Sequence, residues 1–579
     1  MEEGAPRQTM LLTDLPIECW EHFIPADKSM MMSIASMTVK KLMATGRPRL
    51  EIHLSLNARL EIAREGDAKR RVILHKLGVL AMKYKIVTLD LIQFGMTDQD
   101  FPQLAAVLEC SVGLKCLELA YNDIGLGVRS LPYITGLTSL TTLNLAWCNN
   151  LIFWQVSIAR ILRNFPLLRY LSLEGNRIGG VTLEVETPPL CPGLEYLCLR
   201  ENHLKFHSLL CVKEVLRQCP GLQHLDLSCN EFRAAEMDVL VGMFEHSLRL
   251  AYINFDANDM QHDDMDVGLC LAHALSPLTE LTEVNLGFNL LRGLLHLRPV
   301  FEKWKGLQYL NIGYMSIGPG GAKILADLLE HFEQLKGLNA AGNGIGWRGT
   351  QSLACGLDKC RRLTGLNMSN NTIGWQGAEA LSWILGNLPL KFLYLSSCDI
   401  GSRGCEALGQ VAFQHLDDLS ITDNDINVRG VQAIARAVKD WPALKSLSLG
   451  GNFVGIEGMG AVSDVLANSQ GLTSLDLARN NVRDKGVDKL KAGLRRCRTL
   501  KDLVLISNNI TDEGATSLAE ALPLCTALTR LNLSHNDKIG RDGERALRSS
   551  IPLDSPLTIE LLQRSWLKPA GGVAKWYVS

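Results

Sequence analysis

Leucines and polar residues alternate in one template that returns along most of the chain. The template is Leu-x-x-Leu-x-Leu-x-x-Asn-x-Ile, and clear copies begin at residues 114, 168, 222, 472 and 500. In the last copy, alternating Leu503 and Leu505 predict the buried face of a short strand, with Val504 on the other face. Apolar residues at helical spacing follow in 514–522. Each copy therefore predicts a strand, a turn and a helix.

The asparagine of the template marks the period. Its position falls at residues 122, 148, 176, 202, 230, 258, 289, 315, 343, 371, 398, 424, 452, 480, 508 and 536, mostly in steps of 28. A degenerate earlier copy begins at residue 86. Because neither a strand nor a helix can bury its apolar face alone, stacked copies must share one core. We therefore expect an α/β solenoid of about 16 to 17 repeats over residues 86–556. Its parallel strands would line the concave face of a curved horseshoe, and its helices the convex face.

These copies resemble the leucine-rich repeat family, in particular its long-repeat, ribonuclease-inhibitor-like class. The resemblance implies a ladder of asparagine side chains that satisfies backbone groups in the turns. Cys148 and Cys398 stand at the asparagine position in two repeats, which the family tolerates. Met315 stands there in a third repeat. A methionine cannot make the ladder hydrogen bonds, so we expect looser structure around it.

Glycine recurs at one position in eight successive repeats, from Gly321 to Gly514. Its first occurrence lies in GPGGAK at 318–323, which resembles a phosphate-binding loop but lacks the full spacing of one. A glycine that returns with the period is better explained by packing. We interpret it as a device for close contact at the helix entry.

The first 45 residues lack the period. Segment 12–24, LTDLPIECWEHFI, predicts an amphipathic helix with proline in its first turn, and 27–43 is expected to add short helices. This helical segment, residues 1–45, resembles an F-box, the module that docks on the Skp adaptor of cullin ubiquitin ligases. The matching residues are Leu15, Pro16, Glu18, Ile34, Met37, Val39, Lys40 and Lys41. The resemblance implies that adaptor docking would use Leu15, Pro16, Glu18 and Trp20. The alternative is a helical extension of the cap.

A repeat array needs caps that cover its exposed ends. Residues 46–85 are expected to form a helical cap and connector, with a helix over 66–85 that begins near Asp67. Residues 557–579 are expected to form the C-terminal cap and tail.

Aromatic residues gather in two columns of the N-terminal half, on positions that alternate with the leucines. They are Tyr121, Trp147, Tyr170, Tyr196, Tyr252, Phe288, Tyr309 and Tyr314. Tyrosine and tryptophan give large contact areas at low entropic cost and dominate protein interfaces. We therefore hypothesise a partner-binding patch on the concave face. The alternative is cross-strand aromatic packing that stabilises the sheet.

A second candidate surface lies where each turn enters its helix. Its aligned positions include Trp347, Trp375, Val428 and Ile456, which would form an apolar stripe along one rim of the horseshoe. Exposed apolar patches usually mark contacts. We hypothesise a second partner surface there, and the alternative is that each indole folds onto the neighbouring loop.

Composition narrows the function further. The 579 residues include 59 basic and 61 acidic ones, so the net charge of -2 disfavours nucleic acid as the main partner. We expect neither a secretory signal nor a membrane span, and the 16 cysteines then indicate reduced thiols in a cytoplasmic or nuclear protein. The acidic cluster 262–266 lacks the spacing of a calcium loop. With no catalytic motif found, we expect no catalytic residue, no metal, no cofactor and no enzyme.

The pattern as a whole favours a non-enzymatic protein that binds other proteins. Its most concrete form is an F-box-like substrate adaptor, whose partners would be the Skp adaptor and cullin and whose horseshoe would select a substrate for ubiquitin transfer. The alternatives are a plain binding scaffold or inhibitor, and a GTPase activator of the Ran-activator type, whose array this chain resembles.

Overall fold

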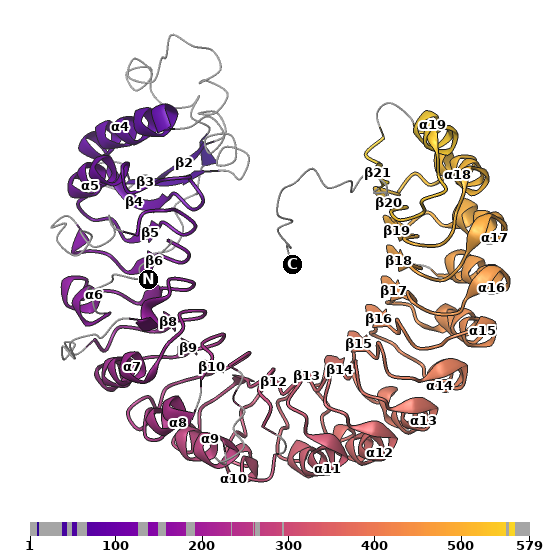
Figure 1. Ribbon diagram of the computed structural model, residues 1–579, viewed down its shortest axis with the longest axis horizontal. Helices are drawn as coiled ribbons and strands as arrows, with labels where there is room; N and C mark the ends of the chain where they lie inside the picture. Colours follow the sequence, from indigo (N-terminus) through magenta and orange to yellow (C-terminus); the bar gives the residue numbers. More distant parts are fainter. Residues whose placement is uncertain are drawn as a thin grey trace. The chain divides into compact units, whose positions relative to one another are not determined.

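The structure is a computed structural model of the chain. It describes residues 9–10, 37–42, 49–54, 67–125, 137–148, 158–180, 191–232, 234–258, 260, 267–291, 294–469, 471–551 and 555–561. The chain divides into two compact units, unit 1 (Met1–Asn289) and unit 2 (Leu290–Ser579). In each unit, strands lie along one side and helices along the other (Figure 1). We call the sheet surface that points away from the helices the strand-lined face.

Unit 1 begins with a short antiparallel arrangement and continues as a parallel sheet. Its strands are β1 (Thr9–Met10), β2 (Met37–Leu42), β3 (Arg49–Leu54), β4 (Lys85–Asp90), β5 (Cys116–Glu118), β6 (Thr142–Asn144), β7 (Tyr170–Ser172), β8 (Tyr196–Cys198), β9 (His224–Asp226), β10 (Tyr252–Asn254) and β11 (Glu283–Asn285). Its helices are α4 (Asp67–Lys83), α5 (Phe101–Cys110), α6 (Ile158–Asn164), η5 (Ile178–Gly180), α7 (Phe206–Gln218), α8 (Ala234–Leu240) and α9 (Val267–Leu275). Strands β3 to β11 pair in chain order, all parallel.

Unit 2 repeats the same strand and helix alternation. Its strands are β12 (Tyr309–Asn311), β13 (Gly337–Asn339), β14 (Gly365–Asn367), β15 (Phe392–Tyr394), β16 (Asp418–Ser420), β17 (Ser446–Ser448), β18 (Ser474–Asp476), β19 (Asp502–Val504), β20 (Arg530–Asn532) and β21 (Thr558–Glu560). Its helices are α10 (Arg298–Phe301), α11 (Gly318–Leu329), α12 (Gly346–Leu357), α13 (Gly374–Leu385), α14 (Gly401–Leu408), α15 (Val428–Ala437), η6 (Val438–Asp440), α16 (Gly455–Asn468), α17 (Arg483–Arg496), α18 (Asp512–Ala519), η7 (Leu522–Leu524) and α19 (Arg541–Ser549). Strands β12 to β21 are parallel neighbours in chain order.

The register keeps the leucines of successive repeats side by side. Leu475 pairs with Leu503, which pairs with Leu531, and all three side chains are buried. Helix residues one layer away, such as Leu490 and Leu518, complete the core. The predicted fold class, an α/β leucine-rich repeat solenoid, is confirmed.

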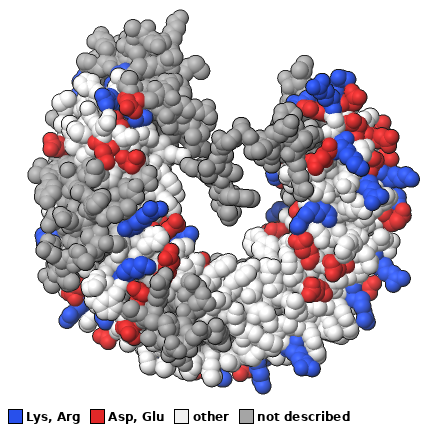
Figure 2. All heavy atoms as spheres, in the orientation of Figure 1, with Lys and Arg blue, Asp and Glu red and all other residues white. Residues whose placement is uncertain are grey.

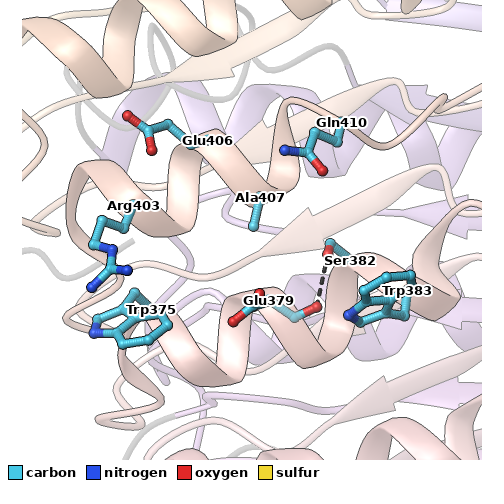
Figure 3. Close-up of a pocket in the computed structure, with 8 residues that line it drawn as sticks. All are labelled: Trp375, Glu379, Ser382, Trp383, Arg403, Glu406, Ala407 and Gln410. Atoms are coloured by element: carbon cyan, nitrogen blue, oxygen red, sulfur yellow. Dashed lines mark hydrogen bonds between the residues drawn. The ribbon is translucent and has the colours of Figure 1, made fainter.

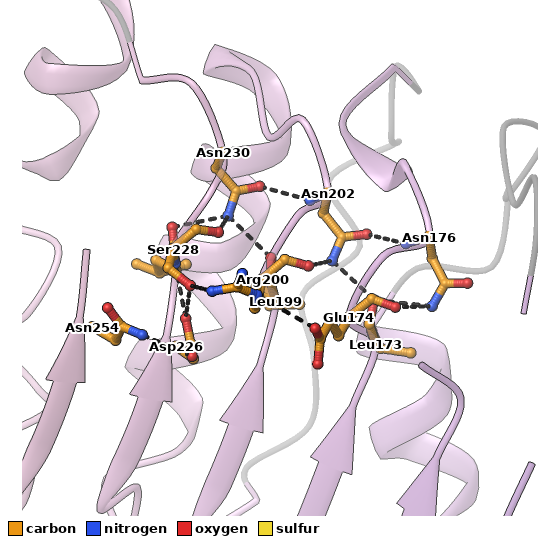
Figure 4. Close-up of polar contacts among 11 residues, drawn as sticks. Leu173, Glu174, Asn176, Leu199, Arg200, Asn202, Asp226, Ser228, Asn230 and Asn254 are labelled. Atoms are coloured by element: carbon orange, nitrogen blue, oxygen red, sulfur yellow. Dashed lines mark hydrogen bonds and ion pairs between the residues drawn. The ribbon is translucent and has the colours of Figure 1, made fainter. Parts of the chain in front are cut away.

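The asparagine ladder forms as the resemblance implies. In unit 1, Asn230 Nδ2 donates to the carbonyl oxygens of Leu199 at 3.0 Å and Leu227 at 2.9 Å. Its Oδ1 accepts from the backbone N–H of Asn202 at 3.0 Å, so each rung joins neighbouring repeats (Figure 4). These buried backbone groups would otherwise lack partners.

Three repeats replace the ladder asparagine. The thiol of Cys148 donates to the Leu119 carbonyl at 3.4 Å, and that of Cys398 donates to the Met368 carbonyl at 3.2 Å. A cysteine thus replaces the hydrogen-bond donor of the asparagine side chain but not its acceptor, the amide oxygen. The side chain of Met315 is buried, and its backbone N–H donates to Asn343 Oδ1 at 3.0 Å. Looser structure around Met315 stays a prediction.

The recurring helix-entry glycine packs where a side chain has no room. A Cβ atom on Gly349 would lie 2.7 Å from Ile345 Cγ2 and 3.1 Å from the Cα atom of Pro319 in the preceding repeat. The interpretation of this glycine as a packing device, rather than part of a nucleotide site, agrees with that contact.

The N-terminal region differs from its expected helices. Residues 37–42 form strand β2, which pairs antiparallel with β1 and β3, where short helices were expected over 27–43. The expected cap helix is present as α4, and Arg70 on it donates to Asp100 Oδ2 at 3.3 Å, next to α5. The prediction was wrong at β2 because apolar Met37 and Val39 alternate with polar Thr38 and Lys40, a pattern that fits a strand better than a helix.

Candidate functional site

Four aromatic rings lie one above another on the strand-lined face of unit 1. Tyr170, Tyr196, His224 and Tyr252 are the first residues of β7 to β10 and pair in register. Successive ring centroids lie 4.1, 4.1 and 3.8 Å apart, with interplanar angles of 17° or less. Neighbouring strands are about 4.8 Å apart, so in-register rings meet face to face. We call these four residues the aromatic stack; its rings pack across strands, and whether a partner also covers them stays a prediction.

The aromatic stack is uncharged at neutral pH. Partial burial lowers the pKa of His224 to about 4, against the opposing effect of the Asp226 carboxylate. Burial also raises the pKa of Tyr252 to about 12 and that of Tyr196 well above its ordinary value. The stack therefore presents a neutral strip of ring edges beside polar groups.

A network of polar side chains borders the aromatic stack. Three of its members, Glu174, Arg200 and Ser228, each lie two residues beyond the end of a strand. Arg200 lies 3.4 Å from a Glu174 carboxylate oxygen and donates to Ser228 Oγ at 3.1 Å (Figure 4). Asp226 is buried and accepts from the Ser228 backbone N–H at 2.8 Å and from Asn254 Nδ2 at 3.0 Å. This network fixes Arg200 across three repeats on the strand-lined face.

The second aromatic column lies on turns rather than on strands. Tyr121, Trp147, Phe288 and Tyr314 follow their strands by three residues and have φ between 52° and 59°. Sequence reasoning assigned them to strand alternation, and this was wrong because the residue before the ladder position adopts a left-handed conformation. Asparagine, aspartate or glycine is the usual choice there. Tyr121 stacks on Trp147 at 6.1 Å and is 55% exposed, and Phe288 is 51% exposed.

Unit 2 carries exposed rings on its strand-lined face as well. Tyr309 on β12 is 45% exposed and Phe392 on β15 is 42% exposed. Between them, Gly337 and Gly365 occupy the same register on β13 and β14. Sequence reasoning missed Phe392, although its place in the register, one strand before Asp418, was available as a signal.

The four rim residues lie at the starts of their helices. Trp347, Trp375 and Ile456 are second residues of α12, α13 and α16, and Val428 is the first residue of α15. Trp347 is exposed, and the other three are half-buried. The guanidinium of Arg403 lies 3.9 Å from the ring centroid of Trp375, so this indole packs against the next repeat. Whether a partner covers the rim stays a prediction.

Other candidate positions are less informative. The expected adaptor-docking residues Leu15, Pro16, Glu18 and Trp20 lie outside the described residues, as does the acidic cluster 262–266. Among the residues that the structure describes, no group of histidine, cysteine, aspartate or glutamate side chains could hold a metal ion. No described helix has both the length and the hydropathy that crossing a bilayer demands. In Figure 2, acidic and basic side chains intermingle on the visible, described surface of unit 2.

Comparison with known proteins supports the repeat assignment. A family model described as "Leucine Rich repeat" matches residues 359–382, 386–409, 414–435, 468–491, 496–519 and 524–547. No curated protein matches the sequence. Among solved structures, a leucine-rich repeat protein of Leptospira interrogans is similar at 20% identity and a TM-score of 0.47, covering 79% of this chain and 98% of that one. An internalin of Listeria monocytogenes is similar at 18% identity and a TM-score of 0.36, covering 64% and 83% of the two chains. The matched segments and the repeating strand, turn and helix agree, and the chain thus carries leucine-rich repeats.

Proposed function

We propose that this chain is a non-enzymatic, protein-binding leucine-rich repeat protein of the cytoplasm or nucleus. Its strand-lined face would hold the partner protein. The observation that supports this proposal is a set of exposed rings, Tyr309 and Phe392 on strands of unit 2 and Tyr121 and Phe288 on the turns that follow strands of unit 1. Large exposed rings have few rotatable bonds and so lose little entropy on contact, and they are enriched among the residues that dominate interfaces.

The chemistry of the face indicates what the partner presents. The aromatic stack is neutral at pH 7 because burial keeps the His224 imidazole uncharged. A partner surface that covers it must therefore be largely apolar or aromatic. The Arg200 and Glu174 pair lies alongside and supplies the polar border that interfaces usually have around an apolar centre.

Paired substitutions test the proposal. The variants Tyr121→Ser with Phe288→Ser, and Tyr309→Ser with Phe392→Ser, remove exposed rings of one unit each. Leu210→Ser removes an exposed apolar residue of α7, on the helix side, and serves as the control. Proteins retained from a cell lysate by the immobilised chain are quantified by mass spectrometry. We expect at least one retained protein to be lost with a ring variant and kept with Leu210→Ser. Equal retention by all four chains would exclude partner binding through these rings.

A finer proposal concerns ubiquitin transfer, in which the repeats would select a substrate for a cullin ligase. It is supported by the Leu15, Pro16 and Glu18 pattern of the sequence, whereas strand β2 departs from the helical F-box pattern at Met37–Leu42. Skp adaptor and cullin are expected to co-purify with the full chain and to be lost with Leu15→Ala and Pro16→Ala. If neither co-purifies, the scaffold role remains, and stimulated GTP hydrolysis by purified GTPases is the assay for the activator alternative.

The repeat class is also a proposal. The step of mostly 28 residues, with a helix of up to 14 residues in each repeat of unit 2, supports the ribonuclease-inhibitor-like class. Shorter repeats have no room for a helix of that length beside a strand and two turns.

A further inference from the structure

A groove lies between α13 and α14 on the helix side of unit 2 (Figure 3). Its volume is about 380 Å³, and both helices line it. Trp375, Glu379 and Trp383 recur every four residues on α13 and so share one face of that helix. Arg403 and Glu406 line the groove from α14, and Arg403 lies over Trp375 (Figure 3). Two aromatic rings, two carboxylates and one guanidinium therefore line one groove.

Trp383 is the unusual residue of this set, since 78% of its surface is exposed. It lies six residues after the helix-entry glycine of its repeat. The same position holds exposed Asp327 and Cys355 in the two preceding repeats, and exposed Gln410 and Arg436 in the two following ones. The packing of the repeat therefore does not require an aromatic ring at this position. A large indole in a place that is otherwise open to water indicates a contact with another molecule.

The groove contains an example of the contact that it favours. At one end, the Arg403 guanidinium lies 3.9 Å from the ring centroid of Trp375, within the range of a cation–π interaction. At the other end, Trp383 has no cation from the described chain. Glu379 and Glu406 form no ion pair with any described residue. The Trp375 indole therefore has a cation of the described chain on its ring. The Trp383 indole and the carboxylates of Glu379 and Glu406 contact no cation of the described chain.

We propose that the groove binds an arginine side chain from a basic segment of a partner protein. The guanidinium would lie on the Trp383 ring, one helical turn from the Glu379 carboxylate, as Arg403 lies on Trp375. Charge selects this occupant, because two carboxylates outnumber the single guanidinium that lines the groove. Arginine fits better than lysine, since its planar and weakly hydrated guanidinium stacks on aromatic faces. A volume of about 380 Å³ is at the small end of ligand pockets and suits one long side chain. The site lies apart from the strand-lined face, so it does not depend on the proposed function.

Binding of a fluorescein-labelled hexa-arginine peptide to the full chain, followed by fluorescence anisotropy, tests the proposal. The matched probe is a hexa-citrulline peptide, which has nearly the same shape without the charge. Trp383→Ala and the pair Glu379→Gln with Glu406→Gln are each expected to weaken hexa-arginine binding on the order of tenfold. Trp383→Phe keeps a ring and is expected to retain part of the affinity.

Two control variants separate the groove from the rest of the surface. Phe453→Ala removes another exposed aromatic ring, and Asp464→Asn removes a carboxylate at the position that corresponds to Trp383 in another repeat. Both are expected to bind hexa-arginine within about twofold of the unchanged chain. Equal thermal unfolding temperatures check the fold of every variant. Unchanged affinity in Trp383→Ala, equal loss in the controls, or equal binding of hexa-citrulline would each overturn the proposal.

Discussion

Asn370 Nδ2 donates a 2.8 Å hydrogen bond to the hydroxyl of Tyr314, although the two residues are two repeats apart. Both occupy the left-handed turn position, and Gly342 holds that position in the repeat between them. Arg479 and Asp423 form a 3.0 Å ion pair in the same way, with Gly451 between them. A glycine at this position therefore lets side chains of non-adjacent repeats meet.

Gly342→Ala is expected to lower the free energy of unfolding of unit 2 by about 2 kcal/mol. A Cβ atom there would lie 2.3 Å from the Tyr314 ring, and the φ of 64° disfavours alanine as well. Gly344→Ala is the matched control, because its φ is 61° but a Cβ atom would meet no other atom within 4 Å. Urea unfolding measures both variants. Equal destabilisation of the two would show that displacement of Tyr314 contributes nothing.

The aromatic stack is expected to make stability depend on pH. The pKa of His224 is about 4 in the folded chain, below the ordinary imidazole value of about 6.5, so protons favour the unfolded state. The contribution of the neutral ring is complete above pH 6.5 and declines as the pH falls towards 4. Between pH 7 and pH 5 we expect a loss of about 1 kcal/mol, allowing for solvent screening of this half-buried ring. Urea unfolding of the unchanged chain and of His224→Phe at both values measures it, and an equal pH dependence of the two chains would refute it.

The thiols are expected to differ strongly in reactivity. Burial raises the pKa of Cys398 and of Cys405 to about 12, so neither forms the reactive thiolate near neutral pH. Cys110 and Cys355 are exposed. Iodoacetamide at pH 8, followed by peptide mass spectrometry, is expected to label Cys110 and Cys355 first. Labelling of Cys405 as fast as Cys355 in the folded chain would contradict this order.

Repair of one rung of the ladder should stabilise unit 2. Cys398→Asn adds an amide oxygen for the backbone N–H of Asn371, as Asn371 Oδ1 accepts from Asn343 at 3.0 Å. We expect a gain of about 1 kcal/mol in the free energy of unfolding. Cys398→Ala removes the thiol bond to Met368 and is expected to lose about 1 kcal/mol. Denaturant unfolding of both variants decides the matter, and a shift of both in the same direction would exclude a specific role of the rung.

The repeating part of the fold was predictable because the same sequence pattern occurs many times along the chain. Leu503 and Leu505 mark a strand whose partners recur in every repeat, and the period alone fixes the parallel register. The aromatic stack followed from the same register, since Tyr170 and Tyr196 stand at equivalent positions. Strand β2 carries no period, so local alternation was the only signal there.

Other parts of the candidate surfaces depend on features that a strand pattern does not contain. The left-handed turn at Tyr121 breaks the alternation three residues beyond the strand, and only backbone geometry reveals it. Trp383 lies on a helix surface, away from the strand and turn columns in which aromatic residues were sought. Its signal was present in the sequence, as a tryptophan aligned with Cys355 and Gln410.

The asparagine ladder also makes the length of the array adjustable. Each rung bonds only within its own repeat and to adjacent repeats, as Asn371 does with the carbonyl of Met368, with Asn343 and with the carbonyl of Ala340. Removal of one whole module of 28 residues, 344–371, would therefore leave two edges that match each other. It would bring Tyr309 closer to Phe392 by one strand spacing, about 4.8 Å. Gain or loss of whole modules therefore changes the distance between two contact points by one strand spacing for each module. The residues that make the contacts stay the same.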